Sequence, residues 1–353
     1  MIRVLVANAY SSENSGDGLL VDETLDLIHE AFGDDVQVTL LASYPESFNH
    51  LGIPVIRSKP NPTGYDPAYR ALLRSKFRDF DLIVGVGGGY LRAGSCTELV
   101  KTGLVMGPQL FQAALSSTPS VYLPQSIGPA RLGSRRLLSA LLKRLSTVWV
   151  RDERSLEEYA LAGVQRSPDL AILGMNRAVL PFDSDAPIVL TVRSHRGGVP
   201  QAVYPLRAQL GVIDSFIQST VGGNNDTKAV ESLLPRKVLE SKALMTGASS
   251  ARVVVAMRLH AALMALRAGH YVIHLSYERK GFGAFADLGL EEYVFNVHDF
   301  DPNRVAKLAQ DLAANEERRD DYDLAIKDAF SAVNSHRSKI VSSLRNAVGQ
   351  RVR

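Results

Sequence analysis

Cysteine is almost absent from this sequence, since Cys96 is the only one in 353 residues. A single cysteine excludes an internal disulfide and any cysteine-based zinc cluster, and it fits a reducing compartment. The sequence also lacks an HExxH motif and an Asp-rich loop. We therefore expect no metal ion, no cofactor, and activity that persists in a chelator.

Long hydrophobic runs are missing as well. No stretch approaches twenty uninterrupted apolar residues, because Arg258, His260 and Arg267 interrupt the longest candidate. The first residues, MIRVLVANAYSS, contain too short an apolar run for a signal peptide. We expect a cytoplasmic protein without a membrane span.

Charge of one sign does not dominate, because the chain has 40 Lys and Arg and 37 Asp and Glu, which gives a net charge of +3. This mildly basic balance suits an anionic small molecule or an anionic membrane surface, and we expect no nucleic-acid partner. The hydrophobic fraction of 46% and the charged fraction of 22% are ordinary for a globular protein. The length favours two domains.

Short apolar runs alternate with amphipathic stretches along most of the chain. The runs IRVLVA, VQVTLLA, DLIVGV, SVYLP and TVWV are continuous rather than alternating, which is typical of parallel strands covered on both faces. A stretch rich in Pro and Asp at 174–187 is the predicted linker. The predicted fold is α/β, with Rossmann-like domains over 1–174 and 187–315 and a helical segment over 316–353.

The second predicted domain is short between IVLTVRSH and GGNND, and we expect it to be trimmed there. Gln125-Ser126 and Gln218-Ser219 form a weak internal repeat, which predicts equivalent strand ends in the two domains. Ligands of open α/β sheets bind outside the carboxyl ends of the strands. With two such sheets facing a central cleft, a motif that directly follows a strand is a candidate for the site.

Four motifs in the first domain meet this criterion. Asn14 and Asp17 lie in a polar turn that enters a helix, where Asp17 caps the helix or contacts a ligand hydroxyl. Gly88 and Gly89 belong to a glycine triplet that permits either a tight turn or close approach by a ligand or another chain segment.

LPQSIGP places Gln125 and Ser126 at a strand end, and WVRDERS places Arg151 after the next strand. Arg151 either pairs at the surface with Asp152 or Glu153, or projects into the cleft to bind an anion.

The stretch VVVAMRLHAALMAL (253–266) is the strongest candidate. It reads as a buried strand followed by a helix, yet Arg258 and His260 stand at the junction. An unpaired buried charge costs several kcal/mol, so Arg258 needs either an internal carboxylate or a bound anion. Tyr277 and Lys280 follow the next strand. Arg258, His260 and Lys280 are then three cationic or potentially cationic donors on neighbouring strand ends, which favours a small polyanion such as a phosphorylated acid.

In this order the motifs resemble the polysaccharide pyruvyl transferase family. The resemblance rests on NSGD (14–17), GVGGG (85–89), LPQSIGP (123–129), RDERS (151–155), SPD (167–169), MRLHA (257–261) and SYERKG (276–281). It implies a GT-B-like pair of Rossmann domains, with the acceptor on the N-terminal domain and the donor anion site on the C-terminal one.

The resemblance implies phosphoenolpyruvate as donor substrate and a cyclic ketal formed across two hydroxyls of a hexose. The acceptor would be a cell-surface polysaccharide or glycolipid precursor, often lipid-linked. The catalytic residues would be His260, as general acid or phosphate ligand, and Asp17, which would orient or deprotonate a hydroxyl. Substrate would be bound by Arg258, Arg151, Lys280, Tyr277, Leu259, Asn14, Gly88, Gly89, Gln125 and Ser126.

Two other functions remain open from sequence. One is a GT-B-type glycosyltransferase that uses a nucleotide sugar, and the other is a non-catalytic glycan-binding subunit. The segment 130–145 combines leucines with five basic residues and could lie on the inner face of an anionic membrane, or pack its leucines on the sheet. The acceptor sugar and the oligomeric state are not indicated by the sequence.

Overall fold

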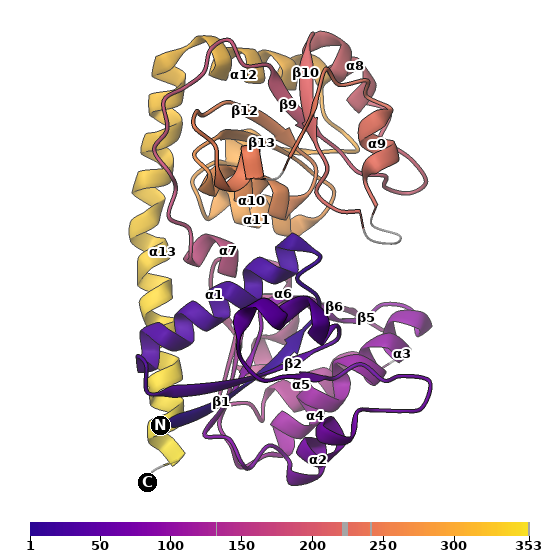
Figure 1. Cartoon of the computed structure of the whole chain (residues 1–353), viewed down its shortest axis with the longest axis vertical. Coiled ribbons are helices and arrows are strands. Elements are labelled where there is room, and N and C mark those ends of the chain that lie inside the picture. Colours follow the sequence, from indigo (N-terminus) through magenta and orange to yellow (C-terminus); the bar gives the residue numbers. More distant parts are fainter. Residues whose placement is uncertain (132, 221–224, 241, 352–353) are drawn as a thin grey trace. The chain divides into compact units, whose positions relative to one another are not determined.

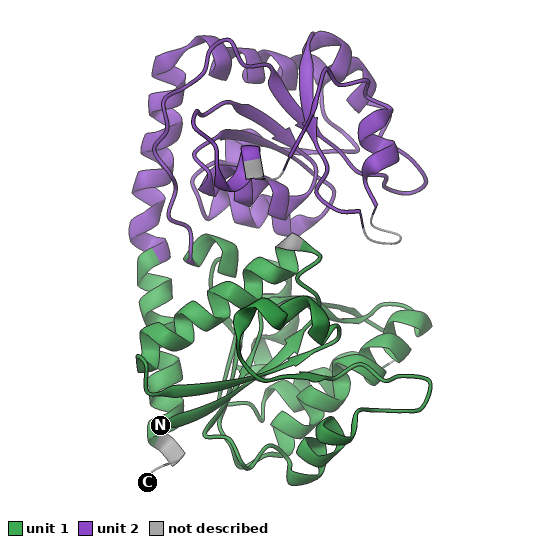
Figure 2. Cartoon of the chain, viewed as in Figure 1, with its two compact units in different colours: residues 1–173, 334–353 green, residues 174–333 purple. Residues whose placement is uncertain are grey.

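The computed structural model describes residues 1–131, 133–220, 225–240 and 242–351. The chain forms two compact units (Figure 2). Unit 1 contains residues 1–173 and 334–353, and unit 2 contains residues 174–333. The predicted linker at 174–187 therefore lies at the start of unit 2.

Unit 1 is a parallel sheet in the order β3-β2-β1-β4-β6-β7-β8, with β5 paired to β6. Figure 1 labels β1, β2, β5 and β6 of this sheet. Its strands are β1 (Ile2–Ala9), β2 (Val36–Ala42), β3 (Val55–Arg57), β4 (Leu82–Gly85), β5 (Gly88–Ala93), β6 (Ser120–Ala130), β7 (Thr147–Val150) and β8 (Gln165–Arg166). Its helices are α1 (Ser15–Phe32), η1 (Pro45–Leu51), α2 (Pro67–Ser75), α3 (Cys96–Val105), α4 (Gly107–Leu115), α5 (Ser134–Leu142), α6 (Glu153–Tyr159), η2 (Ala160–Ala162) and α7 (Leu170–Leu173).

Unit 2 is a second parallel sheet, in the order β11-β10-β9-β12-β13-β14. Its strands are β9 (Ile188–Thr191), β10 (Ile213–Phe216), β11 (Val238–Leu239), β12 (Val253–Ala256), β13 (Tyr271–Ser276) and β14 (Val294–Asn296). Its helices are α8 (Val203–Gln209), α9 (Thr227–Glu231), η4 (Lys242–Thr246), α10 (Leu259–Arg267), α11 (Arg279–Ala286), η5 (Glu291–Tyr293), α12 (Pro302–Ala314) and the first part of α13 (Glu316–Arg351).

The continuous apolar runs form the central strands, as the sequence predicts. Val4, Leu5 and Val6 of β1 and all four residues of β12 are buried, so helices cover both faces of each sheet. Each strand order is that of a Rossmann-type sheet. The predicted α/β class with two Rossmann-like domains is confirmed.

The strand orders correct the predicted internal repeat. Gln125 lies on β6, two strands from β1, whereas Gln218 follows β10, which borders β9 on its other side. The strands are therefore not equivalent, and two shared letters in a polar loop were too little to establish a repeat. The predicted trimming of the second domain is also wrong, because helix α8 and strand β10 are both present, each only a few residues long.

The C-terminal helix α13 contributes to both units. Tyr322 in its first part donates a hydrogen bond to the carbonyl of Val272 in unit 2. Further along, Arg337 pairs with Glu30 at 2.7 Å and Arg345 donates to the carbonyl of Ala31, both in unit 1. Among the described residues, no helix combines the length and the apolar character needed to cross a bilayer.

Candidate active site

The sheet of unit 2 brings the ends of four strands together. β12 pairs with β9 on one side and β13 on the other, with Ala256 aligned to both Thr191 and His274, and β13 pairs with β14. Because all are parallel, the residues that follow them gather at one edge. That edge carries Arg193 and His195 after β9, Arg258 and His260 after β12, Tyr277 and Lys280 after β13, and His298 after β14.

Arg258 has the internal carboxylate that the sequence left unidentified. Asp226 accepts hydrogen bonds from Nε of Arg258 at 2.6 Å and from Nη2 at 2.7 Å, and its side chain is only 2% exposed. Asp226 is held in turn by its backbone N–H, which donates to the carbonyl of Ser219. The guanidinium carries five N–H donors, and these two contacts use one edge of it.

The junction at Arg258 has the predicted form. Arg258 is the extended residue before α10, and Leu259 and His260 are the first two helical residues. Leu259 is buried in the core, whereas His260 is half-buried at the sheet edge, with Nε2 of its imidazole shielded from solvent. The backbone N–H groups of the first turn point the same way and favour an anion.

A cluster of aromatic and cationic side chains surrounds Tyr277. Nη1 of Arg193 donates to the Tyr277 hydroxyl at 3.1 Å, and the ring of His195 lies 4.8 Å from the Tyr277 ring and 5.1 Å from that of His298. The loop after β9 thus reaches residues that follow β13 and β14, passing the end of β12. Burial lowers the pKa of His195, and the charges of His298, Arg196 and Arg193 lower it further, which favours a neutral imidazole at pH 7.

Lys280 lies in the first turn of α11 and pairs with Glu278 at 2.7 Å. Beneath it, His274 is fully buried, and its Nδ1 is 2.8 Å from the carbonyl oxygen of Ala256. Burial lowers the pKa of His274 to about 4, and the charge of Lys280 contributes. Gly281 is required here, because a Cβ would lie 2.1 Å from Oγ of Ser276 and 2.4 Å from Nε2 of His274.

At the corresponding edge of unit 1, Asn14 is the extended residue before α1. Its Nδ2 donates to Asp17 at 2.7 Å, and its carbonyl accepts from the N–H groups of Asp17 and Gly18. Asn14 rather than Asp17 occupies the cap position, and its side chain bonds to Asp17 instead of the helix backbone. The pair fixes the orientation of the Asp17 carboxylate in the first helical turn.

The glycines after β4 leave room for other chain segments. A Cβ on Gly85 would lie 2.6 Å from the Tyr122 ring, and one on Gly87 would lie 2.5 Å from the carbonyl oxygen of Pro124. Gly88 has a φ of 144°, where a side chain would be strained, and it begins β5 instead of ending a turn. Gly89 is exposed, and a Cβ there would lie 3.5 Å from Nη2 of Arg151.

Gln125 lies inside a strand rather than after one. β6 continues to Ala130 because β5 pairs with its second half, with Gly88 aligned to Gln125. The Gln125 side chain is completely buried, and neither its Oε1 nor its Nε2 has a hydrogen-bond partner among the residues that the structure describes. Such an orphaned amide costs about 1–3 kcal/mol, and native proteins keep few of them outside functional sites.

Arg151 is buried, which excludes one of the two alternatives from sequence, the surface pairing with Asp152 or Glu153. Its Nη1 donates to Asp169 and its Nε donates to Oγ of Ser126 at 3.1 Å. Asp152 instead caps α6, and Glu153 pairs with Arg166 at the surface. Asp169 belongs to the SPD motif, but its distance from Arg151 in sequence concealed the pairing. The arrangement holds the guanidinium next to Ser126 and Gly89.

Several site residues were missed. Arg193 and His195 follow strand β9 directly, so the rule that selected Arg258 also selects them. Asp226 lies 32 residues before Arg258, beyond a short strand, and no local pattern connects the two.

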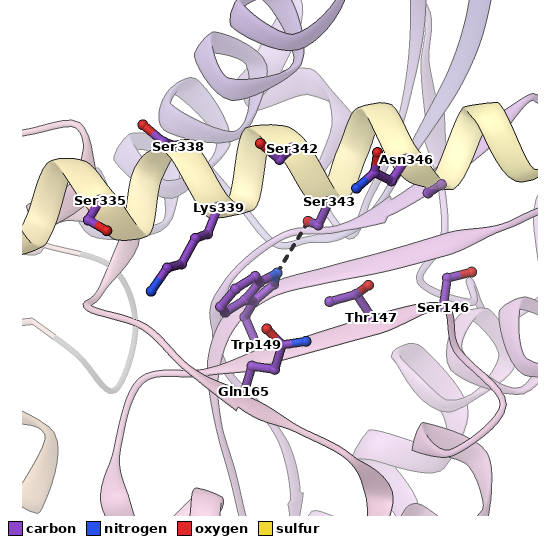
Figure 3. Close-up of a pocket in the computed structure, with 11 residues that line it drawn as sticks. Ser146, Thr147, Trp149, Gln165, Ser335, Ser338, Lys339, Ser342, Ser343 and Asn346 are labelled. Carbon is purple, nitrogen blue, oxygen red and sulfur yellow. Dashed lines mark hydrogen bonds between the residues drawn. The ribbon is translucent and has the colours of Figure 1, made fainter.

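A separate polar cavity of about 710 Å³ lies in unit 1 between β7 and the end of α13 (Figure 3). Trp149, Thr147 and Gln165 line one side, and the helix contributes a row of hydroxyl and amide groups. The indole N–H of Trp149 donates weakly to Oγ of Ser343 at 3.4 Å. None of the predicted site residues lines this cavity.

Within the described residues, no group of three or more His, Cys, Asp or Glu side chains could hold a metal ion. The side chains at the two sheet edges supply forked cationic donors, imidazoles, carboxylates and amides.

Solved structures similar to this chain share its two-domain α/β fold. Anabaena Alr3699/HepE, solved in complex with UDP and glucose, is 14% identical with a TM-score of 0.56, and the match covers 100% of this chain and 99% of that one. The UDP-GlcNAc 2-epimerase of Neisseria meningitidis is 12% identical with a TM-score of 0.53, covering 97% and 99%. MurG of Acinetobacter baumannii is 12% identical with a TM-score of 0.51, covering 98% and 100%.

At these identities the likeness concerns the fold alone, which is GT-B-like. A comparison with curated protein sequences found no significant match. The model of one family, described as polysaccharide pyruvyl transferase, matches residues 14–279. The chain therefore belongs to the polysaccharide pyruvyl transferase family and is a transferase of polysaccharide biosynthesis.

Proposed function

We propose that this protein transfers the pyruvyl group of phosphoenolpyruvate to two hydroxyls of a hexose in a cell-surface glycan precursor. The observation that carries the proposal is the family match together with the cationic edge of unit 2. Phosphoenolpyruvate carries a carboxylate and a phosphate, and a small dianionic or trianionic ligand needs several donors at one point.

The charges at this edge decide which residues bind the donor. Arg258 is neutralised by Asp226 and Lys280 is partly neutralised by Glu278, so these pairs add little net charge. Most of the net positive charge at this edge therefore comes from Arg193 and from the partial charges at the N-terminus of α10. We assign Arg258 and Leu259 to one anionic group of the donor, and Lys280, with Arg193, to the other. Tyr277 positions Arg193 through its hydroxyl.

The reaction requires one proton on carbon and the loss of two from the acceptor. Protonation of the donor methylene at C3 forms a methyl group and a cationic C2, which one acceptor hydroxyl attacks with loss of its proton. The C2–O bond to phosphate then breaks, and the second hydroxyl attacks C2 to close the ketal. One of the two hydroxyl protons balances the proton gained at C3, and the other leaves on phosphate.

His260 is the candidate for the acid that protonates C3, because an imidazole can carry its proton near neutral pH. On unit 1, Asp17 would take or orient an acceptor hydroxyl proton, with Asn14 holding its carboxylate. Gly88, Gly89, Gln125 and Ser126 would contact the acceptor, and Arg151 remains a predicted anion ligand. These are the residues that we would substitute first to test the proposal.

Thermal unfolding with phosphoenolpyruvate, inorganic phosphate or a panel of nucleotide sugars tests the donor. A ligand at about a hundred times its dissociation constant stabilises by about 2.7 kcal/mol. We expect stabilisation by phosphoenolpyruvate in the wild type and none in Arg258→Ala, while His260→Ala should retain more binding than turnover. Stabilisation by a nucleotide sugar instead would contradict the proposal and favour a glycosyltransferase.

A further inference from the structure

Helix α3 of unit 1 turns its apolar side chains outward. Val105, its last residue, is the one buried residue of the helix. Leu99, Val100 and Leu104 are 36%, 59% and 50% exposed. Residues three and four apart share one side of a helix. That side, which we call the α3 face, consists of Cys96, Leu99, Val100, Gly103 and Leu104.

The orientation of α3 is fixed by polar contacts on its other side. Ser95 accepts a hydrogen bond from the N–H of Glu98 and begins the helix. Oγ1 of Thr102 donates to the carbonyl of Arg92 at 2.6 Å, and the hydroxyl of Tyr65 donates to the carbonyl of Leu104 at 2.6 Å. Because these bonds hold both ends of the helix, the α3 face points toward solvent, and neighbouring exposed apolar side chains of this kind are a feature of interaction surfaces.

Basic residues border the α3 face on the side of the sheet edge. The ammonium of Lys101 lies 5.9 Å from the Tyr10 ring, and that of Lys59 lies 4.5 Å from the Tyr44 ring. Lys59 also donates to the Tyr44 hydroxyl at 2.7 Å, and this bond lowers the pKa of Tyr44. Tyr10 and Tyr44 follow β1 and β2, so α3 stands beside the edge of unit 1 that we assign to the acceptor.

We propose that the α3 face docks unit 1 onto an anionic lipid bilayer. The apolar side chains of the α3 face would enter the membrane–water interface, while Lys101, Lys59 and the exposed Arg131 contact anionic headgroups. A second copy of the chain is a poorer occupant, because a symmetric pairing would bring the same basic border face to face. The choice of a bilayer rests on the proposed function, and on a lipid-linked form of its glycan acceptor, which the family resemblance implies.

The segment 130–145 is not the apolar part of this surface. Leu138, Leu142 and Leu145 belong to the core of unit 1, and among the described leucines of the segment only Leu137 is strongly exposed. That helix packs its leucines on the sheet, which was the open alternative from sequence.

Sedimentation of the full chain with vesicles tests the proposal. Vesicles of phosphatidylcholine alone are compared with vesicles of equal parts phosphatidylcholine and phosphatidylglycerol. We expect binding to the anionic vesicles, and loss of that binding in the double variant Val100→Ser/Leu104→Ser. Lys101→Gln should weaken it about fivefold. The matched control is Leu161→Ser, because Leu161 is 86% exposed in η2, outside the α3 face.

Three outcomes would overturn the proposal: no binding to either vesicle, equal loss of binding in Leu161→Ser, or a dimer in sedimentation equilibrium that only the double variant dissociates. Stabilisation by phosphoenolpyruvate is measured on the same samples. If the double variant keeps that stabilisation while vesicle binding is lost, folding and the donor site are intact. If the wild type binds vesicles but is not stabilised by phosphoenolpyruvate, the proposed donor fails and the docking surface stands.

Discussion

The Asp226 carboxylate forms a bidentate ion pair with Arg258, at 2.6 Å to Nε and 2.7 Å to Nη2. The carboxylate is 2% exposed and the guanidinium 14%, so water screens the pair poorly. Asp226 therefore fixes the plane of the guanidinium at the end of β12 before any ligand arrives. A preorganised donor of this kind loses less freedom when it binds an anion.

Asp226→Asn should destabilise the protein strongly. Removing one partner of a buried pair leaves an uncompensated charge and costs about 3–5 kcal/mol. Urea unfolding measures this cost directly. The matched control is Glu292→Gln, which breaks the more exposed pair with Arg318 in the same unit and should cost about 1 kcal/mol at most. Equal effects of the two substitutions would show that Asp226 does not hold Arg258 in solution.

Arg193→Ala should weaken donor binding without unfolding the protein, because Arg193 is only half-buried and contacts Tyr277 at the sheet edge. Loss of a charge-assisted contact of about 1.5–3 kcal/mol predicts a rise in KM for phosphoenolpyruvate of roughly ten- to a hundredfold. Arg196→Asn is the control. Arg196 is exposed on the same loop with a φ of 52°, which asparagine tolerates, so this variant removes a charge without strain. A KM that rises equally in both variants would indicate a general electrostatic effect of positive charge and no specific contact between Arg193 and the donor.

Gln125→Met should stabilise the protein while lowering turnover. The buried amide has no partner among the described residues, so a similarly shaped apolar side chain should add about 1–2 kcal/mol to the free energy of unfolding. If the amide contacts the acceptor, kcat/KM for the acceptor falls in the same variant. Such opposite effects on stability and activity are typical of residues kept for function.

Gln109→Met is the control for Gln125. Gln109 is equally buried, but its side chain accepts from the N–H of Asn8 at 2.8 Å and donates to the carbonyl of Val105 at 3.1 Å. This variant should be less stable than the wild type. If Gln125→Met destabilises as much as Gln109→Met, the Gln125 amide has partners in solution and its assignment to the acceptor loses its support.

The fold could be predicted from sequence because its strands are continuous apolar runs separated by amphipathic helices. β1 and β12 are buried along most or all of their length, and that pattern distinguishes parallel sheets from other arrangements. The positions of Arg258, Lys280 and Tyr277 followed from the same reasoning, since each comes directly after such a strand. Arg193 could have been found in this way too.

The partners of these residues could not be predicted, because they depend on long-range packing. Asp226 and Asp169 are acids in loops or at helix starts, and nothing in their local sequence selects Arg258 or Arg151. The sequence predicts that Gln125 stands at the end of its strand, with Gly128 and Pro129 in the loop that follows, but pairing with β5 extends β6 to Ala130. Pairing with β5, an earlier segment of the chain, thus overrides the local signal that would end the strand.

The pH dependence of stability should reveal His274 beneath the candidate donor site. Burial lowers the pKa of His274 to about 4, with the charge of Lys280 contributing, whereas its ordinary value is 6.5. The folded state therefore keeps the imidazole neutral where the unfolded chain protonates it. The contribution of His274 to the free energy of unfolding is fully present above pH 6.5, and it decreases as the pH falls from about 6.5 to about 4. The loss should reach about 3 kcal/mol.

His274→Gln isolates this contribution. Urea unfolding at a series of pH values should show a shallower decline for the variant than for the wild type between pH 6.5 and pH 4. His270, which is also buried with a lowered pKa, remains in both proteins and sets a common background. Parallel curves for the wild type and His274→Gln would contradict this prediction. They would mean that the His274 imidazole binds its proton as readily in the folded protein as in the unfolded chain.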